Sequence, residues 1–269
     1  MADAGRERAG RGIDFGRLYG YRFKDVDQAA RQAVWGEIAP HLYELLGRPG
    51  TVLDPAAGRC EFVNALPGVE RWIVDTTDHT EGFTRDPEIK VVISDIRDAP
   101  LPAGHFEGVL VSNFLEHLDS QNAVADVLAH LRRSMAPDGR IAVLGPNFKY
   151  CAREYFDCAD HEIALTHVSV AEHLYAAGFE IDRVVPRYVR IVSAVRAITP
   201  ALIAVGALLS LTVVAGTADA GEQGEPPAPS AALTGEPAAP RAGPHGRPFV
   251  TVLMAVPLVT YAGATGPHP

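Results

Sequence analysis

Short runs of hydrophobic residues recur along the first 190 positions of the chain, separated by polar residues and glycines. The runs are nearly continuous in apolar residues, which is typical of strands that are covered on both faces of a sheet. They predict six strands, at residues 51–54, 71–75, 90–95, 106–113, 140–147 and 179–189. Because helical patterns lie between several of them, we expect a doubly wound α/β sheet with mostly parallel strands.

Helical spacing of apolar residues is clearest in three segments. Residues 25–46 end at Gly47, and Pro40 is expected to bend or divide this helix. Residues 120–135 are amphipathic, and a Pro-Asp-Gly turn follows them. The third helix is expected to start at Ser169, which forms a capping box with Glu172, and to end at Gly178.

The most informative stretch is TVLDPAAGRCEF, residues 51–62, where a strand meets a helix through a turn of small residues. Asp54 ends the strand, and Gly58 lies in the turn, where the missing Cβ lets a ligand approach the backbone. Such a turn exposes N–H groups at the carboxyl edge of a parallel sheet, where ligands bind. Taken alone, the pattern also fits an ordinary connection between a strand and a helix.

Acidic residues end the first three predicted strands, at Asp54, Asp75 and Asp95. In an open parallel sheet these strand ends border one crevice. An acid after the second strand can accept hydrogen bonds from a ribose diol, and one after the third can accept from an exocyclic amine. Asp54, beside exposed N–H groups, suits the ammonium group of a zwitterion. Three acids in this order indicate one extended ligand.

The composition bears on which partners the protein can bind and on its location in the cell. The formal net charge of −9 argues against binding of nucleic acid, which favours a basic surface. The three cysteines form no disulfide framework, and the charged, glycine-rich start of the chain does not resemble a secretory signal. We therefore expect a cytoplasmic protein.

The composition changes after residue 190. Residues 198–216 carry no charge and have about the length of a bilayer span, with arginines before them and acids after them. Residues 220–246 are rich in Gly, Pro and Ala, and residues 248–256 have the pattern of a last strand. Three interpretations stay open: a membrane anchor that tethers a cytoplasmic domain, an insertion before a seventh strand, or out-of-frame translation of GC-rich DNA.

Four segments in order carry a resemblance to a known family: VLDPAAGRCEF (52–62), WIVD (72–75), ISDIRDAPLPAGHFEGVLVSNFLEHL (93–118) and LRRSMAPDGRIAVLGPN (131–147). Together they resemble the class I S-adenosylmethionine-dependent methyltransferases, in particular the small-molecule branch of the type 11 and type 12 kind. The resemblance covers residues 52–183. It implies a Rossmann-like, seven-stranded sheet with an antiparallel last strand, S-adenosyl-L-methionine as the cofactor, and a small-molecule methyl acceptor.

The resemblance also implies roles for matched positions. The turn lines the methionine end of the cofactor, the second acid holds the ribose, the third acid and its neighbour flank the adenine, and the end of the fourth strand borders the sulfonium. In that order, these residues are Asp54, Ala56, Gly58 and Cys60; Asp75; Asp95 and Ile96; and Asn113 and Phe114. The family usually has Gly-x-Gly where this chain has Gly58-Arg59-Cys60. If Cys60 needs a positive φ, cofactor affinity should fall.

Residues 147–167 are expected to form a loop over the crevice, with aromatic, acidic and histidine side chains on the acceptor side. Within them, DHEIALTH resembles a segment of methyltransferases from glycan and natural-product pathways. His161 is the first candidate for a base, with Asp160 to orient it and His117 as the second candidate. A structural hydrogen-bonding role fits His161 about as well.

Two further sets of residues could contribute to the site, a cysteine and histidine set and an aromatic segment near the start of the chain. No metal is expected, because zinc-site spacing is absent from the set Cys151, Cys158, His161 and His167. An aromatic and basic segment near the start of the chain either folds over the cofactor as a lid or packs an N-terminal helix; its residues are Tyr19, Arg22 and Phe23.

These features predict an enzyme that transfers a methyl group from S-adenosylmethionine to a small acceptor, a hydroxyl of a sugar or secondary metabolite. The alternative is a non-catalytic, methyltransferase-like binding or assembly protein, which Cys60 and the unusual tail would explain. The expected organisation is a disordered tail (1–12), a helical cap (13–50), the cofactor-binding domain (51–190) and the atypical tail (191–269). The sequence leaves the acceptor and the oligomeric state open.

Overall fold

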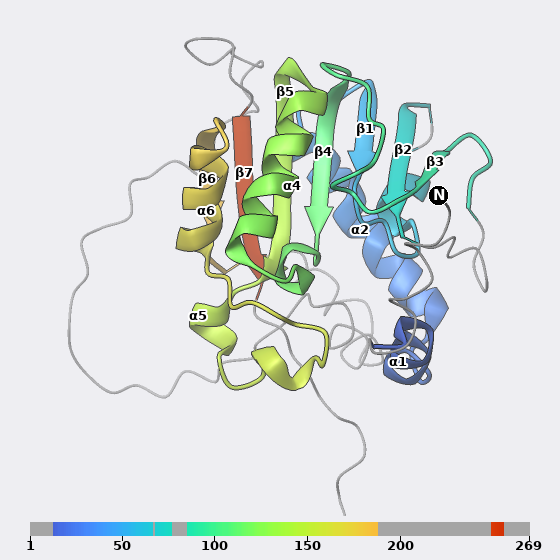
Figure 1. Ribbon diagram of the computed structural model, residues 1–269. Helices are drawn as coiled ribbons and strands as arrows, with labels where there is room; N and C mark the ends of the chain where they lie inside the picture. The colour runs from blue at the N-terminus through green and yellow to red at the C-terminus, as the bar shows by residue number, and fades with distance from the viewer. Residues whose placement is uncertain (1–12, 67, 77–84, 188–248, 256–269) are drawn as a thin grey trace, which may run out of the picture.

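A sheet of seven strands forms the centre of the computed structural model, which describes residues 13–66, 68–76, 85–187 and 249–255 (Figure 1). The strand order is β3-β2-β1-β4-β5-β7-β6. The strands are β1 (Thr51–Asp54), β2 (Glu70–Asp75), β3 (Lys90–Ile93), β4 (Phe106–Ser112), β5 (Met135–Pro146), β6 (Glu180–Val185) and β7 (Phe249–Ala255). All six strands predicted in the first 190 residues are confirmed, and the predicted strand at 248–256 is the seventh.

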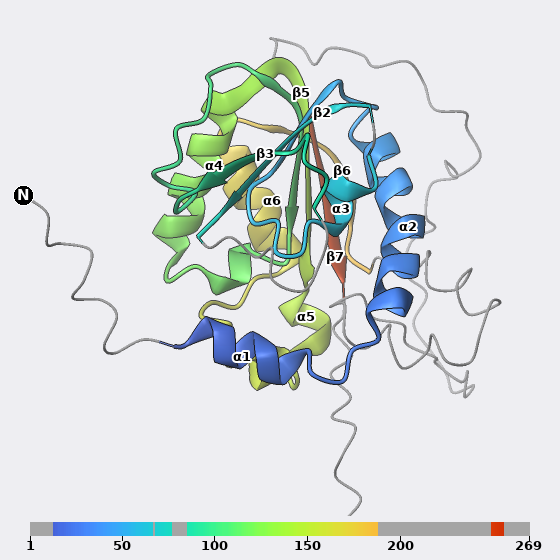
Figure 2. The ribbon, with the colours of Figure 1, turned by 90° about the vertical axis from the view of Figure 1, so that its right-hand side faces the viewer.

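Helices cover both faces of the sheet, so the molecule has three layers (Figure 2). One face carries α2 (Gln28–Leu45) and α3 (Glu61–Asn64), and the other carries α4 (Gln121–Ser134) and α6 (His167–Ala176). Each face has its own core, with Ile38 and Leu42 of α2 on the first and Val124 and Leu128 of α4 on the second. The described residues also form the helices α1 (Phe15–Arg22), η2 (Leu115–His117), α5 (Phe148–Cys151) and η3 (Tyr155–Asp157).

The last strand, β7, runs parallel to both of its neighbours, β5 and β6. The structure thus corrects the expected antiparallel strand. A short hairpin after β6 would have produced an antiparallel pair. Here residues 186–248 separate the two strands, which is enough chain to return to the opposite edge of the sheet before β7 begins.

The expected membrane segment at 198–216 lies outside the described residues. Within the parts of the chain that the structure describes, no helix combines the length and the hydrophobicity needed to cross a bilayer.

Two helices differ in detail from their prediction. α2 continues through Pro40 and is not divided there. α6 begins two residues before the expected Ser169, with Thr166 as its N-cap. The hydroxyl of Ser169, rather than Glu172, completes the capping box by accepting from the Thr166 N–H at 2.9 Å.

β5 begins at Met135, five residues earlier than predicted, because the turn-like Pro-Asp-Gly segment is absorbed into the strand. A register shift between Phe106 and Gly108 of β4 accommodates the extra length. Gly139 is required here, since a Cβ at this position would lie 2.9 Å from the carbonyl oxygen of Phe106.

Candidate functional site

The carboxyl ends of β1, β2, β3 and β4 lie at one edge of the sheet, the lower edge in Figure 1. In the register, Asp54 pairs with Ile73, so Asp75 reaches two residues further along the sheet. Asp75 in turn pairs with Ile93, and Asp95 follows two residues later. The three acids therefore follow one another along the edge in the order that the sequence predicts.

The turn after β1 is open on one side. Gly58 has a φ of +49°, and a Cβ at this position would meet no atom within 4 Å. Its N–H donates to Oδ2 of Asp75 at 3.1 Å, so the turn and the second acid are directly linked. The open space beside Gly58 leaves room for a ligand to approach the backbone of the turn.

Cys60, where the chain departs from the family pattern, adopts the left-handed conformation, with φ +61° and ψ +21°. It forms the N-cap of α3, and its side chain is buried. This conformation costs a non-glycine residue about 1–2 kcal/mol. The position is therefore one at which glycine would be favoured, and the chain accepts backbone strain here.

Asp54 is the most deeply buried of the three acids, with 4% of its surface exposed. Burial raises the pKa of its carboxyl to about 7, and the nearby Asp75 adds to this, while the Ala56 N–H at 3.4 Å opposes it. An ammonium group placed here would favour the ionised carboxylate and replace the lost hydration.

Asp95 is held by Arg97, which approaches it from three atoms: its backbone N–H at 2.9 Å, Nε at 3.0 Å and Nη2 at 2.6 Å. These hydrogen bonds outweigh burial and lower the pKa of the Asp95 carboxyl. The side chain of the neighbouring Ile96 is buried in the same hydrophobic core as the apolar face of α4. A contact of Ile96 with a ligand would therefore come from its backbone.

The end of β4 carries a second strained residue, Asn113, with φ +47°. Its N–H donates to the carbonyl of Leu144 at 2.7 Å, but within the described residues its buried Oδ1 finds no hydrogen-bond partner. An unpartnered buried oxygen is costly, which fits a group that a ligand satisfies. Phe114 follows it and packs partly against the core.

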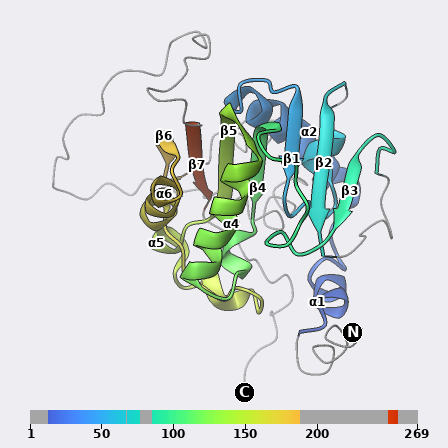
Figure 3. The same ribbon diagram turned by 45° about the horizontal axis from the view of Figure 1, so that its top comes forward.

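α1 lies at the carboxyl edge, below the ends of β2 and β3 (Figure 3). It buries none of its residues in the core. Asp160, only 2% exposed, anchors it by accepting from the Tyr19 hydroxyl at 3.1 Å and from both terminal nitrogens of Arg22. Burial and the charge of Asp160 raise the pKa of the Tyr19 hydroxyl, and the nearby charge of Asp75 makes a smaller contribution in the same direction. This placement fits the predicted cover over the crevice better than packing on the sheet.

η2, immediately after β4, brings Glu116 and His117 next to His161 of the 147–167 loop. The His117 and His161 rings lie 5.0 Å apart, and His161 also packs on Tyr155. Nδ1 of His117 lies 2.8 Å from the carbonyl oxygen of Asp160 and 3.4 Å from its carboxylate. Asp160 therefore orients His117, whereas the sequence had assigned it to His161.

Burial dominates the electrostatics of this cluster. It lowers the pKa of His161 to about 4, which leaves the imidazole neutral and weakly basic at pH 7. It raises the pKa of Glu116, which is 3% exposed. Burial would also raise the pKa of Asp160, but the hydrogen bonds and charge of Arg22 together with His117 lower it. Glu116 is not among the residues predicted from sequence, although its place in FLEHL beside His117 was a usable sign.

The cysteine and histidine set considered for zinc does not gather. Cys151 donates to the carbonyl of Asn147 at 3.0 Å, and His167 stacks on Tyr150. In the described part of the chain, a different set comes together: Glu116, His117 and His161.

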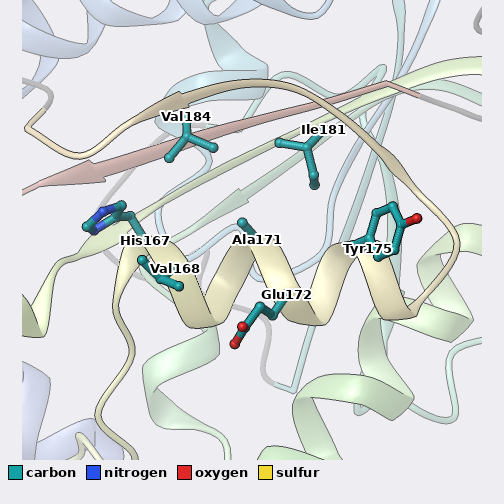
Figure 4. Close-up of a pocket in the computed structure, with 7 residues that line it drawn as sticks. All are labelled: His167, Val168, Ala171, Glu172, Tyr175, Ile181 and Val184. Atoms are coloured by element: carbon teal, nitrogen blue, oxygen red, sulfur yellow. The ribbon is translucent and has the colours of Figure 1, made fainter. Parts of the chain in front are cut away.

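A separate groove lies between α6 and β6, at the opposite side of the sheet from the acids (Figure 4). It is mostly apolar, with Val168, Ala171, Ile181 and Val184 in its lining. It contains none of the predicted site residues.

Comparison with known proteins agrees with this geometry. Residues 53–143 match a family model described as a methyltransferase domain. A solved S-adenosylmethionine-dependent methyltransferase from Archaeoglobus fulgidus is 19% identical, with a TM-score of 0.51 over 73% of this chain and 95% of the other. A Thermotoga maritima protein described as a possible histamine N-methyltransferase is 16% identical, with a TM-score of 0.48 over 62% of this chain and 78% of the other. None of the curated proteins matches the chain.

The matched family model and the fold identify residues 53–143 as a methyltransferase domain of the class I, S-adenosylmethionine-dependent kind. Within that class, the chain carries the methyltransferase domain of the family matched by residues 53–143, and S-adenosyl-L-methionine is its cofactor.

Proposed function

We propose that this enzyme methylates a hydroxyl oxygen of a small molecule, such as a sugar or a secondary metabolite. The observation that carries this proposal is the contact of α1 with Asp160 of the 147–167 loop. Through this contact α1 covers the edge of the sheet where the three acids lie (Figure 2). A macromolecular acceptor would need that edge to be open. Tyr19, Arg22 and the histidines then face an acceptor of limited size.

The cofactor supplies a methyl group on a sulfonium, and the chain must hold it in line with the acceptor oxygen. We assign its ammonium group to Asp54, its carboxylate to the turn at Ala56, Gly58 and Cys60, its ribose to Asp75, its adenine to Asp95 and Ile96, and its sulfonium to Asn113 and Phe114. The open space at Gly58, the buried Asp54 and the unpartnered oxygen of Asn113 support this assignment.

A hydroxyl acceptor must also lose its proton during the reaction. We assign this activation to the imidazole cluster of His117 and His161, with Asp160 as the residue that positions His117. Replacing His161 by Ala is expected to lower turnover while cofactor binding persists. An unchanged turnover at neutral pH would remove His161 from the acceptor side.

Calorimetry with S-adenosylmethionine tests the cofactor assignment. Asp75→Ala is expected to weaken binding roughly 10- to 100-fold, since hydrogen bonds to a charged group contribute about 1.5–3 kcal/mol. Asp126→Ala, an exposed acid on α4, is the matched control and should bind as the wild type does. Equal affinity in the two variants would contradict the ribose assignment, and no binding at about millimolar cofactor would contradict the whole proposal.

A further inference from the structure

Glu116 has an unusual environment for a carboxylate. It is one of the residues that line a small pocket, together with Leu115, Val143, Leu165 and Val170. Its Oε1 has no hydrogen-bond partner among the described residues. A buried charge is normally paired or bound to a metal ion. Nε2 of His117 lies 3.9 Å from this oxygen, which is too far for a hydrogen bond.

In each of the two neighbouring imidazoles, one ring nitrogen bonds to the backbone and the other has no hydrogen-bond partner among the described residues. Nδ1 of His117 lies 2.8 Å from the carbonyl oxygen of Asp160, so donation there leaves the lone pair on Nε2. Nδ1 of His161 is buried without a partner, while the ring has a hydrogen bond to the backbone of Tyr155. A backbone carbonyl behind each ring is the usual outer support of a metal-binding histidine.

From these contacts we propose that Glu116, His117 and His161 bind a divalent transition-metal ion through Oε1, Nε2 and Nδ1. One ligand atom from each residue lies within 4.8 Å of the others, whereas a tetrahedral zinc site brings them to roughly 3.4 Å. A side-chain movement of about 1 Å closes the difference. Two histidines and one carboxylate form a donor set that zinc and iron accept in proteins.

The cluster is accessible from solvent and leaves a coordination position vacant. The His117 side chain is 21% exposed, so an ion reaches the cluster from that side. Three protein ligands leave at least one coordination position for a ligand that is not part of the chain. We assign that position to the acceptor oxygen, and this assignment alone rests on the proposed function. The proton of the bound hydroxyl then leaves to water. In this arrangement the two histidines act as ligands, and the ion rather than an imidazole activates the hydroxyl of the proposed function.

Metal titration tests the site without acceptor or cofactor. The full chain, free of any histidine tag and stripped with a chelator, is titrated with Co²⁺ while its visible absorbance is followed, and Zn²⁺ is then added in competition. One equivalent is expected to bind. Glu116→Gln, which keeps the size of the side chain, and His161→Ala should each weaken binding by more than the roughly 10- to 100-fold typical of an outer-shell change.

Two control variants separate this site from other ligands. His41→Ala removes an exposed histidine on α2, and Cys158→Ser removes the thiol nearest to the 147–167 loop histidines in sequence; both should bind as the wild type does. Absence of Co²⁺ and Zn²⁺ binding in the wild type, or wild-type affinity in Glu116→Gln, would overturn the proposal. Calorimetry with S-adenosylmethionine on the same samples shows whether the proposed function fails with it.

Discussion

Cys60 shows how one residue can depart from a family pattern without losing the backbone shape. Its φ of +61° is that of the glycine it replaces, so the turn keeps its form at the expense of local strain. The buried thiol gains contacts with the α2 and α3 core that glycine would not make. The two effects oppose each other, and their balance decides how well the turn is organised for the cofactor.

Comparison of Cys60→Gly with Cys60→Ala separates these effects, because both lose the thiol and only glycine relieves the strain. We expect the Gly variant to be more stable than the Ala variant by about 1 kcal/mol. Urea unfolding of the two variants measures the difference. An Ala variant as stable as the Gly variant would contradict a left-handed backbone at this position.

Asp54 predicts a pH dependence of cofactor affinity. Because burial raises its pKa to about 7, the free protein holds this carboxyl neutral below that pH and ionised above it. An α-amino group stays mainly protonated over this pH range, so only the acid changes its charge. Affinity should therefore rise between about pH 5.5 and 7, by up to roughly tenfold per unit, and then level off.

The matched variant for this effect is Asp54→Asn, which keeps the shape and cannot ionise. It should bind the cofactor more weakly than the wild type at pH 7 and show no dependence on pH in calorimetry over the same range. A slope that persists in the Asn variant would assign the effect to another group.

At the scale of elements, α1 depends on its anchor more than on its own sequence. It contributes no buried residue to the core, and eight residues are too few for a stable isolated helix. The hydrogen bonds from Tyr19 and Arg22 to the buried Asp160 are what fix it over the edge.

Arg22→Leu should therefore release α1. Loss of hydrogen bonds to a charged partner is worth about 1.5–3 kcal/mol, so amide exchange in residues 15–22 should become roughly 10- to 100-fold faster. Arg17→Ala, an exposed arginine on the same helix, is the control and should leave exchange unchanged. Equal exchange in both variants would show that another contact holds the helix.

The start of α6 gives a second test at this scale. Thr166 accepts from the Ser169 N–H at 3.2 Å, whereas Glu172 is exposed on the helix surface. Thr166→Ala should lower the free energy of unfolding by about 1 kcal/mol, and Glu172→Gln should not change it measurably. Urea midpoints that shift in the opposite order would restore the capping box predicted from sequence.

At the scale of the whole molecule, β7 joins two parts of the sheet that do not pair with each other. It pairs along its full length with β5 and also with β6. Without it, β6 loses its strand neighbour in the sheet.

A chain that ends after Arg187 should accordingly lose cooperative urea unfolding, because β5 is left with an unpaired, buried edge. A chain that ends after Ala255 keeps every described strand and is the control. Cooperative unfolding of the shorter chain, with cofactor binding intact, would show that the tail contributes nothing to the sheet and would favour the out-of-frame interpretation.

Much of the site could be read from sequence because its residues are tied to strand ends. Asp54, Asp75 and Asp95 follow apolar runs, and parallel strands bring their ends to one edge wherever the helices lie. The acceptor side could not be read in the same way. Tyr19, Glu116 and Asp160 come from three segments far apart in the chain, and no local pattern relates them.

The sequence by itself determined the alternation of strands and helices, the sheet, the cofactor class and the order of the acids. The elements and the order of the acids depend on periodicity and on neighbours along the chain, so local physical chemistry is sufficient for them, whereas the cofactor class came from the resemblance of the motifs to a known family. Only the tertiary structure decided the direction of β7, the left-handed backbone of Cys60, the pairing of Asp160 with His117, and the meeting of Glu116 with two histidines. Each of these depends on the free energy of contacts between distant segments, which a single sequence does not display.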